Sequence, residues 1–413
     1  MPQTNATPHP GALAGVRVLD LSRVLAGPYC TQLFADLGAT VWKLEALTGD
    51  DTRRWGPPFA EGESAYFLSV NRGKKGLCID LKHPEGREVA WRLALEADVL
   101  VENFKVGDLA RYGLDYASLA AAHPGLIYAS VTGFGQTGPR RAEPGYDAAM
   151  QAFGGLMSLT GTPDGPPVKV GVAVVDVLAG LHLAVGILAA LFERTRSGRG
   201  QHLDVALFDV AVASLINQAQ GFLLTGTPPR RLGSEHPQIV PYGAFRAADG
   251  FLVLAVGNDA QFVRACLALG LPELAADPRF ETNAGRVAAR EEVVGRLAER
   301  LKAQPRAVWL ARLRAANVPA TPVQNLAEVF AEPQLAARGM TGSVLHPALG
   351  PLEVVGSPLK HLSRTPARLG AAPPRLGEHT AEVLQEVLGL SAEEVGRLER
   401  EGALRTLPES QEG

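Results

Sequence analysis

Short apolar runs alternate with helical stretches through the first third of the chain. The runs that are typical of strands lie at residues 16–20, 40–44, 76–81, 99–102 and 126–131. Helical stretches at residues 28–37 and 85–97 lie between them, and the first is opened by Pro28 and closed by Gly38, as helices commonly are. Strands that alternate with helices in this way form βαβ units, whose strands pair in parallel. The sequence therefore predicts an α/β domain built on a parallel sheet.

The pattern changes after a long helical run that ends near Leu224. Residues 226–231 are typical of a linker, residues 241–255 of a hairpin, and residues 286–313 of charged amphipathic helices. A Pro-rich stretch then leads to terminal helices within residues 379–400. We predict a large domain at residues 14–222, a smaller domain at 223–335, and a segment at 336–413 that links back to the large domain.

The composition of the 413-residue chain excludes several classes of protein. Hydrophobic residues make up 46% and charged residues 20%, with a formal net charge of -3 and a pI near 6.3. A nucleic-acid binder would show a basic patch or a much higher pI. Three scattered cysteines have neither zinc-ligand spacing nor a disulfide pattern, and the first ten residues are unlike a signal peptide. We expect a cytoplasmic protein with a loose N-terminal tail and no metal site.

Asp176 stands between the apolar run 168–175, which is typical of a strand, and the apolar helical stretch 177–192. In open α/β sheets, ligands bind outside the carboxyl ends of the strands, so a carboxylate at this junction is a candidate nucleophile. The alternative is that Asp176 only caps the helix, since Asp is a favourable N-cap residue. The stretch is shorter than a membrane span and contains His182, so we expect a buried core helix.

Two further motifs each allow a functional and a structural interpretation. Residues 133–138 match the G-x-G-x-x-G pattern of dinucleotide sites, but residues 139–144 are not the apolar helix that such a site requires. A glycine-rich loop in close contact with a ligand or a neighbouring chain fits better. The basic residues Arg72, Lys74, Lys75 and Lys82 form either a solvated face or a site for a phosphate-rich ligand.

Taken together, an ordered series of motifs resembles the class III CoA-transferases, which include formyl-CoA transferase and the carnitine CoA-transferases. The segments that carry the resemblance are residues 18–28, 35–45, 71–75, 101–104, 132–139, 145–147, 197–201 and 376–380, together with the Asp176 segment. Residues 233–245, 257–258 and 329–333 look most like the succinyl-CoA:glutarate branch of this family. The likeness runs from about Gly15 to Leu390.

The resemblance implies that Asp176 is the nucleophile. The reaction would proceed through an aspartyl anhydride and then an aspartyl-CoA thioester. The backbone N–H groups of Gly257 and Asn258 would stabilise the developing negative charge, and Lys74 and Lys75 would reach the phosphates of CoA. The residues that the resemblance places near CoA are Val24, Leu25, Ala26, Arg72, Lys74, Lys75, Asn103, Phe104, Arg111, Thr132, Gly133, Phe134 and Tyr146.

The same resemblance implies an interlocked homodimer with a Rossmann-like large domain and a smaller α+β domain. Acyl-CoA, with succinyl-CoA as the expected donor, and a carboxylic acid such as glutarate would be the substrates. No permanently bound cofactor, no nucleic acid and no membrane are implied as partners.

Two other functions remain open at this stage. An α-methylacyl-CoA racemase has the same fold, but that family places a histidine base where this chain has Tyr146, and tyrosine is a poor base near neutral pH. A non-catalytic acyl-CoA-binding protein would bind the thioester without turning it over.

Overall fold

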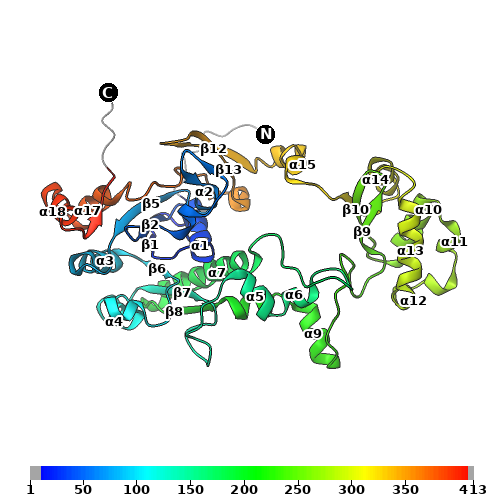
Figure 1. The fold of residues 1–413 in the computed structure, drawn as a ribbon, viewed down its shortest axis with the longest axis horizontal. Helices are drawn as coiled ribbons and strands as arrows, with labels where there is room; N and C mark the ends of the chain where they lie inside the picture. Colours follow the sequence, from blue (N-terminus) through cyan, green and yellow to red (C-terminus); the bar gives the residue numbers. More distant parts are fainter. Residues whose placement is uncertain (1–10, 408–413) are drawn as a thin grey trace. The chain divides into compact units, whose positions relative to one another are not determined.

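The computed structural model describes residues 11–407 (Figure 1), so the predicted N-terminal tail lies outside the described residues. The chain divides into two compact units. The first comprises residues 11–155, 170–216 and 336–407 of the described chain, and the second comprises residues 156–169 and 217–335. The domain borders predicted near residues 223 and 335 fall close to two of these borders. The short excursion of residues 156–169 into the second unit has no counterpart in the prediction.

A seven-stranded sheet is the centre of the first unit, in the order β14-β5-β2-β1-β6-β7-β8. Every neighbouring pair is parallel except β14 with β5, which is antiparallel. The strands are β1 (Arg17–Asp20), β2 (Thr40–Glu45), β5 (Lys74–Ile79), β6 (Val99–Glu102), β7 (Ile127–Thr132), β8 (His202–Ala206) and β14 (Leu404–Arg405). The prediction of an α/β fold with a parallel sheet is confirmed.

Helices cover both faces of this sheet, and this explains why its central strands are continuous apolar runs. Side chains of α3, α4, α17 and α18 share one buried cluster with the strands. On the other face α1 contacts β2 and β6, and α7 contacts α1, β7 and β8. The helices of this unit are α1 (Ala26–Asp36), α2 (Ala65–Ser69), α3 (Pro84–Glu96), α4 (Tyr116–Ala122), α5 (Asp147–Phe153), α7 (Val174–Ser197), α8 (Leu207–Ala213), α17 (Thr380–Leu388) and α18 (Ala392–Arg400).

The C-terminal segment returns to the first unit, where β14 pairs with Ile79 and Cys78 at the edge of the sheet. The backbone N–H of His379 donates to the carbonyl of Gly76, which docks the start of α17 beside β5. Two small hairpins complete this unit: β3 (Phe59–Ala60) with β4 (Glu63–Ser64), and β12 (Thr341–His346) with β13 (Gly350–Val355).

The second unit has its own antiparallel sheet and its own core. The predicted hairpin is present as β9 (Tyr242–Ala247) and β10 (Gly250–Ala255), and β11 (Ala320–Pro322) pairs with β10. Phe262, Trp309 and Leu297 belong to one buried cluster beneath this sheet. The helices are α6 (Leu156–Leu159), α9 (Ile216–Thr225), α10 (Asp259–Leu269), α11 (Pro272–Ala275), α12 (Asn283–Ala288), α13 (Arg290–Leu301), α14 (Arg306–Ala315), α15 (Leu326–Phe330) and α16 (Pro333–Ala337).

Two predictions about the Asp176 region are wrong. The apolar run before Asp176 forms no strand: Val168 and Val172 are 42% and 63% exposed, and helix α7 begins at Val174. The run lies where the chain passes from the second unit back to the first, and it has no strand beside it to pair with. The N-cap of α7 is Ala173, so Asp176 lies inside the first turn and is not the capping residue.

Helix α7 is partly a core helix and partly exposed. Apart from the bent pair α8 and α9, it is the one helix within residues 11–407 that is long and apolar enough to cross a membrane. Its buried side, which includes Ala179, Leu183 and Ile187, packs inside the first unit. His182 is exposed, so the expectation of a buried core helix holds for one side of α7 only.

Candidate active site

The strand order of the large sheet reverses between β1 and β6, and a cavity opens at the carboxyl ends of these two strands. Arg23 and Val24, which follow β1, line it together with Asn103 and Phe104, which follow β6. Asp176 from the first turn of α7 lines the same cavity. A point of reversal at the carboxyl ends of parallel strands is where open α/β sheets bind their ligands.

Asp176 lines this cavity as a buried carboxyl group. Its side chain is buried and, within the part of the chain that the structure describes, has no hydrogen-bond or ion-pair partner. Burial, followed by the nearby charge of Asp147, raises the pKa of Asp176 to about 7. A buried carboxyl group that is kept without a cation at the wall of a cavity is typical of a functional site.

Asp147 holds the first turn of α7 in place. Its Oδ1 accepts hydrogen bonds from the backbone N–H groups of Val175 at 2.8 Å and Asp176 at 3.4 Å. Its Oδ2 accepts from the side-chain amide of Gln151 at 2.6 Å. Asp147 therefore both fixes the backbone that carries Asp176 and places a second negative charge beside it.

Asn103 joins the two strand-end loops. Its Oδ1 accepts from the backbone N–H of Arg23 at 2.9 Å, and its Nδ2 donates to the Arg23 carbonyl at 2.7 Å. The Arg23 guanidinium lies 5.6 Å from the centre of the Phe104 ring. The backbone N–H of Phe104 donates to Glu102 at 2.8 Å, and burial raises the pKa of Glu102 to about 7. The predicted contacts Asn103 and Phe104 thus lie at the cavity, where they also fix its walls.

The glycine-rich loop after β7 packs against its own chain. A Cβ atom on Gly133 would lie 2.7 Å from the Cα of Gly145, and a Cβ on Gly145 would lie 2.5 Å from the Cα of Gly133. Only glycine allows two backbone segments to pass this closely. The close neighbour of Gly133 is therefore the segment that leads to Tyr146, and both Gly133 and Tyr146 line the cavity.

The basic cluster that was predicted to reach the phosphates of CoA is committed to other partners. The Lys74 ammonium is fully buried and bonds Asp20 and Asn71, and buried Arg72 pairs with Asp36. Lys75 pairs with Glu382 and Glu386 on α17. The expectation fails for both residues because the fold encloses them: Lys74 opens β5 and is buried against Asp20, and Arg72, two residues before the strand, is buried against Asp36 of α1. None of the three lines the cavity.

Four other predicted residues also lie outside the cavity lining. Arg111 is exposed and pairs with Asp108, and the Phe134 ring packs against Phe153 and Phe208. Gly257 and Asn258 belong to the second unit. The Gly257 N–H already donates to the Gln261 side chain at 2.7 Å, so this expected donor is engaged in the structure. The Asn258 side chain accepts from the backbone N–H of Gln261 and caps helix α10.

The structure adds cations that the sequence reasoning missed. Arg23, Lys105 and Arg141 line the cavity beside the predicted residues. Arg23 and Lys105 are direct sequence neighbours of the predicted contacts Val24 and Phe104. This adjacency is the sequence feature from which they could have been predicted. The nine predicted residues that do line the cavity are Val24, Leu25, Ala26, Asn103, Phe104, Thr132, Gly133, Tyr146 and Asp176.

Comparison with known proteins decides the family. The model of CoA-transferase family III matches residues 13–380. The chain belongs to this family and is an enzyme that transfers CoA. It is 48% identical to the succinate–glutarate CoA-transferase of Agrobacterium fabrum, over 91% of this chain and 95% of the relative. It is 43% identical to the succinyl-CoA:glutarate CoA-transferase of Mus musculus, over 91% of this chain and 86% of that one.

A solved structure from the same group resembles the fold of this family III CoA-transferase. The crystal structure of a CAIB/BAIF family protein from Brucella suis superposes with a TM-score of 0.83 at 45% identity, and the match covers 92% of this chain and all of that one. The family and the named relatives make CoA thioesters the substrates of this enzyme class.

Proposed function

We propose that this enzyme moves CoA from succinyl-CoA to glutarate and that Asp176 is its nucleophile. The names of the two relatives support the substrate pair. The observation that carries the mechanism is the position of Asp176, a buried carboxyl group without a partner at the wall of the cavity.

The first half of the reaction transfers CoA to the enzyme. An oxygen of the Asp176 carboxylate attacks the thioester carbonyl of succinyl-CoA, the C–S bond breaks, and CoA leaves as a thiolate. The product is a mixed anhydride of succinate and Asp176. The thiolate then attacks the aspartyl carbonyl, which releases succinate and leaves an aspartyl-CoA thioester.

The second half repeats these steps in reverse with glutarate. A glutarate carboxylate attacks the aspartyl thioester and displaces the thiolate, and the thiolate attacks the glutaryl carbonyl of the new anhydride. Glutaryl-CoA leaves and the Asp176 carboxylate is restored. One thioester is exchanged for another, so no ATP is consumed, provided that water is kept from the anhydride.

The environment of Asp176 suits this role. Burial that raises its pKa to about 7 also makes its carboxylate a better nucleophile than a solvated one, because basicity and nucleophilicity rise together. The same burial limits the access of water to the aspartyl carbonyl. The developing negative charge requires oriented N–H donors. The Gly257–Asn258 loop is the proposed source of these donors, and the Gly257 N–H would have to leave Gln261 to take part.

For the phosphates of CoA we propose Arg23, Lys105 and Arg141 in place of Lys74 and Arg72. All three cations line the cavity, and guanidinium groups bind phosphate oxygens strongly. Arg23 already pairs with Asp51 at 3.3 Å, an exposed contact that phosphate can replace.

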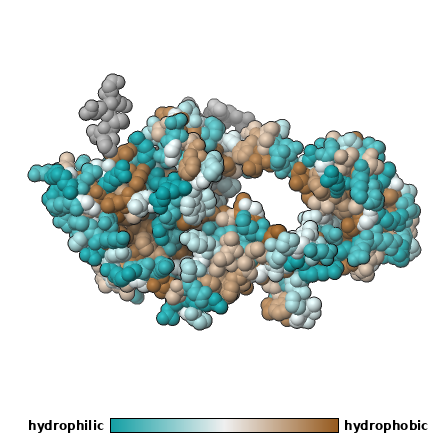
Figure 2. All heavy atoms as spheres, in the orientation of Figure 1, coloured by the Kyte–Doolittle hydropathy of each residue, from teal (hydrophilic) through white to brown (hydrophobic). Residues whose placement is uncertain are grey.

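The exposed side of α7 supports the homodimer that the resemblance implies. Leu181, Val185, Leu188 and Phe192 follow one another at helical spacing and are 39–67% exposed. On the face drawn in Figure 2, apolar residues gather near the place where Figure 1 labels α5 and α7. An apolar stripe of this length is typical of an interface. We propose that a second copy of the chain covers this stripe. The Val185→Asp variant should therefore sediment as a monomer in analytical ultracentrifugation.

Two further proposals, the Rossmann-like large domain and the cytoplasmic location, each have one supporting observation. When the small hairpin strands β3 and β4 are left out, the six parallel strands follow the order 3-2-1-4-5-6, which supports a Rossmann-like large domain. The three cysteines are buried and unpaired, which suits the proposed cytoplasmic location.

Mass spectrometry of the enzyme with succinyl-CoA and a panel of carboxylic acids tests the proposal. Glutarate should give glutaryl-CoA, and enzyme trapped with succinyl-CoA alone should carry CoA on the peptide that contains Asp176. The Asp176→Ala variant is the control and should give neither product. Exchange of the α-hydrogen of a 2-methylacyl-CoA with deuterated water, without transfer, would instead identify a racemase, and binding without any turnover would identify a binding protein.

A further inference from the structure

Val24 adopts an unusual backbone conformation at the wall of the cavity. Its φ is 71°, in the left-handed region, where a β-branched side chain crowds its own backbone. Such a conformation is strained and persists only when the surrounding structure enforces it. Val24 lines the cavity together with Asp176, and helix α1 begins two residues later at Ala26. The conformation of Val24 therefore sets the path of the chain beside the reactive carboxyl group.

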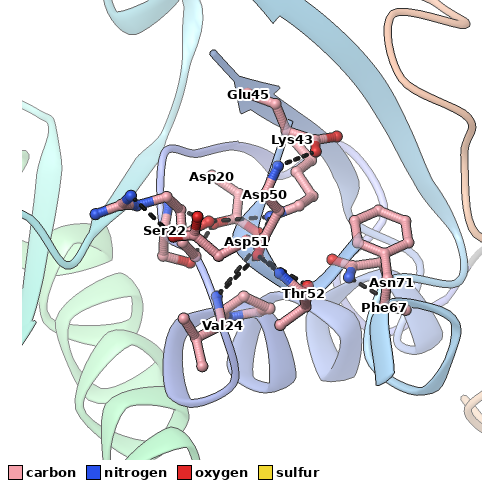
Figure 3. A network of polar contacts seen from close by, with 12 residues as sticks. Asp20, Ser22, Val24, Lys43, Glu45, Asp50, Asp51, Thr52, Phe67 and Asn71 are labelled. Atoms are coloured by element: carbon pink, nitrogen blue, oxygen red, sulfur yellow. Dashed lines mark hydrogen bonds and ion pairs between the residues drawn. The ribbon is translucent and has the colours of Figure 1, made fainter. Parts of the chain in front are cut away.

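The side chain of Asp50 is hydrogen-bonded to the backbone of Val24 (Figure 3). Both oxygens of its carboxylate accept from the backbone N–H of Val24 at 3.3 Å. Asp50 also accepts from the backbone N–H of Thr52 at 3.0 Å and from the Thr52 hydroxyl at 2.8 Å. Its own backbone N–H donates to Glu45 at 2.8 Å, so the carboxylate is held in place from several sides.

Lys43 links Asp50 to the residue two positions before Val24. Its ammonium lies 3.0 Å from Asp50 and donates to the Ser22 carbonyl, also at 3.0 Å. Both side chains of the Lys43–Asp50 pair are fully buried. With Asn103 on the backbone of Arg23, three side chains from other segments thus hold Ser22, Arg23 and Val24 in succession.

We propose that Asp50 is a positioning residue for acyl-CoA binding: it holds Val24 in the left-handed conformation and so keeps residues 23–26 in the shape that receives the thioester. The proposal rests on the proposed function, because it concerns the same cavity. Asp50 does not touch the reacting atoms. Its effect belongs to the affinity for acyl-CoA and not to the chemical step.

A double-mutant cycle between Asp50 and Val24 tests this. The Asp50→Asn variant should raise the KM for succinyl-CoA about tenfold, the effect of one lost hydrogen bond to a charged group, and change kcat less than about twofold. In a Val24→Gly background the same Asp50→Asn change should raise KM less than about threefold, because glycine adopts a positive φ without strain. An equal effect in both backgrounds, or an unchanged KM in the single variant, would overturn the proposal.

A matched control separates positioning from loss of stability. Asp36→Asn also removes a buried carboxylate, one that pairs with Arg72 and has no contact with Val24. It should lower the unfolding midpoint without raising KM, and a rise in KM equal to that of Asp50→Asn would contradict a specific role of Asp50. If Asp50→Asn does not fold, Asp50→Glu keeps the charge beside Lys43 and displaces the oxygens from Val24, and it should raise KM in the same way.

A measurement without substrate keeps this proposal distinct from the proposed function. Hydrogen exchange of the Val24 amide in the unliganded enzyme should be faster in Asp50→Asn than in the parent and unchanged in Asp36→Asn. If the enzyme transfers no CoA to glutarate but the exchange result holds, the proposed substrate is wrong and the positioning role stands. If transfer occurs and the Val24 amide exchanges equally in all three proteins, the positioning role is wrong.

Discussion

Two buried aspartates near the same cavity are held in opposite electrostatic states. Asp50, behind the loop that follows β1, faces the Lys43 ammonium and two donors from Thr52, and these hold its pKa at about 2 against the effect of burial. Asp176, in the first turn of α7, has no cation beside it, and burial together with Asp147 raises its pKa to about 7. Burial is common to both residues, so the partners account for the difference.

The difference separates a structural carboxylate from a reactive one. A carboxylate whose lone pairs are satisfied by a cation and N–H groups is a stable acceptor that fixes backbone, and it is a weak nucleophile. A carboxyl group that is desolvated without partners retains its basicity and can form a bond with a substrate. The two sides of the cavity use the same residue type for these two tasks.

We expect the largest effect from a variant without the reactive carboxylate of Asp176. Asp176→Asn keeps the shape of the side chain but has no carboxylate to attack a thioester, so kcat should fall by at least about four orders of magnitude. A steady-state assay of glutaryl-CoA formation measures this. Circular dichroism and the unfolding midpoint should match the parent, and measurable turnover in the variant, once contamination by the parent is excluded, would contradict the nucleophile assignment.

We expect the next largest effect from a variant without Lys43, the cation that pairs with Asp50. Lys43→Met should lower the free energy of unfolding by about 3 kcal/mol, because the Asp50 carboxylate would be left buried without its counter-charge. Lys75→Met is the matched control, since Lys75 is partly exposed and pairs with surface glutamates, and it should cost less than about 1 kcal/mol. Urea unfolding of the two variants measures the free energies. Equal losses of unfolding free energy would mean that the buried Lys43–Asp50 pair stabilises the fold no more than a surface pair does.

A third prediction concerns the charge beside Asp176. The Asp176 nucleophile must be ionised, so kcat/KM should rise with pH through a midpoint near 7 and level off above it. Asp147→Asn removes the neighbouring charge and should move this midpoint down by about one unit. The pH–rate profile measures the shift, and Asp98→Asn, at a distant ion pair with Arg194, should leave the midpoint unchanged.

The same two residues should act oppositely on folding stability as the pH changes. The folded-state pKa of Asp176 is raised, so its contribution to stability is complete below pH 3.8 and is lost as pH rises through about 7. The folded-state pKa of Asp50 is lowered, so its contribution is present above pH 3.8 and is lost as pH falls through about 2. Unfolding curves of Asp176→Asn should lack the decline toward pH 7 that the parent shows.

We expect the smallest effect from the loss of one hydrogen-bond donor to Asp50, the Thr52 hydroxyl. Thr52→Ala removes the hydroxyl that donates to Asp50 at 2.8 Å and should cost about 1 kcal/mol of unfolding free energy. Thr52→Ser retains the hydroxyl and should cost less. Thermal unfolding of the two variants measures this, and an equal loss in both would assign the effect to the methyl group and not to the bond with Asp50.

The sequence by itself determined the parallel sheet, the family and the choice of Asp176 as candidate nucleophile. Strand and helix periodicities are local properties, so β1, α1 and β2 could be read from residues 16–44, and the order of motifs was enough to indicate the family and its candidate nucleophile. The hairpin of β9 and β10 was predictable for the same reason, since its turn and its alternation lie within a few residues.

Only the tertiary structure decided which charges are free to act. Lys74, Lys75 and Arg72 form one basic cluster in the sequence, but the fold buries Lys74 against Asp20 and Arg72 against Asp36. It places Lys75 beside α17, more than 300 positions along the chain. Asp50 and Asp176 are both acidic residues in the sequence, and nothing local shows that one faces Lys43 and the other faces an open cavity. Burial and pairing depend on segments that meet only in the folded chain, and these two quantities set the pKa and therefore the chemistry of each carboxyl group.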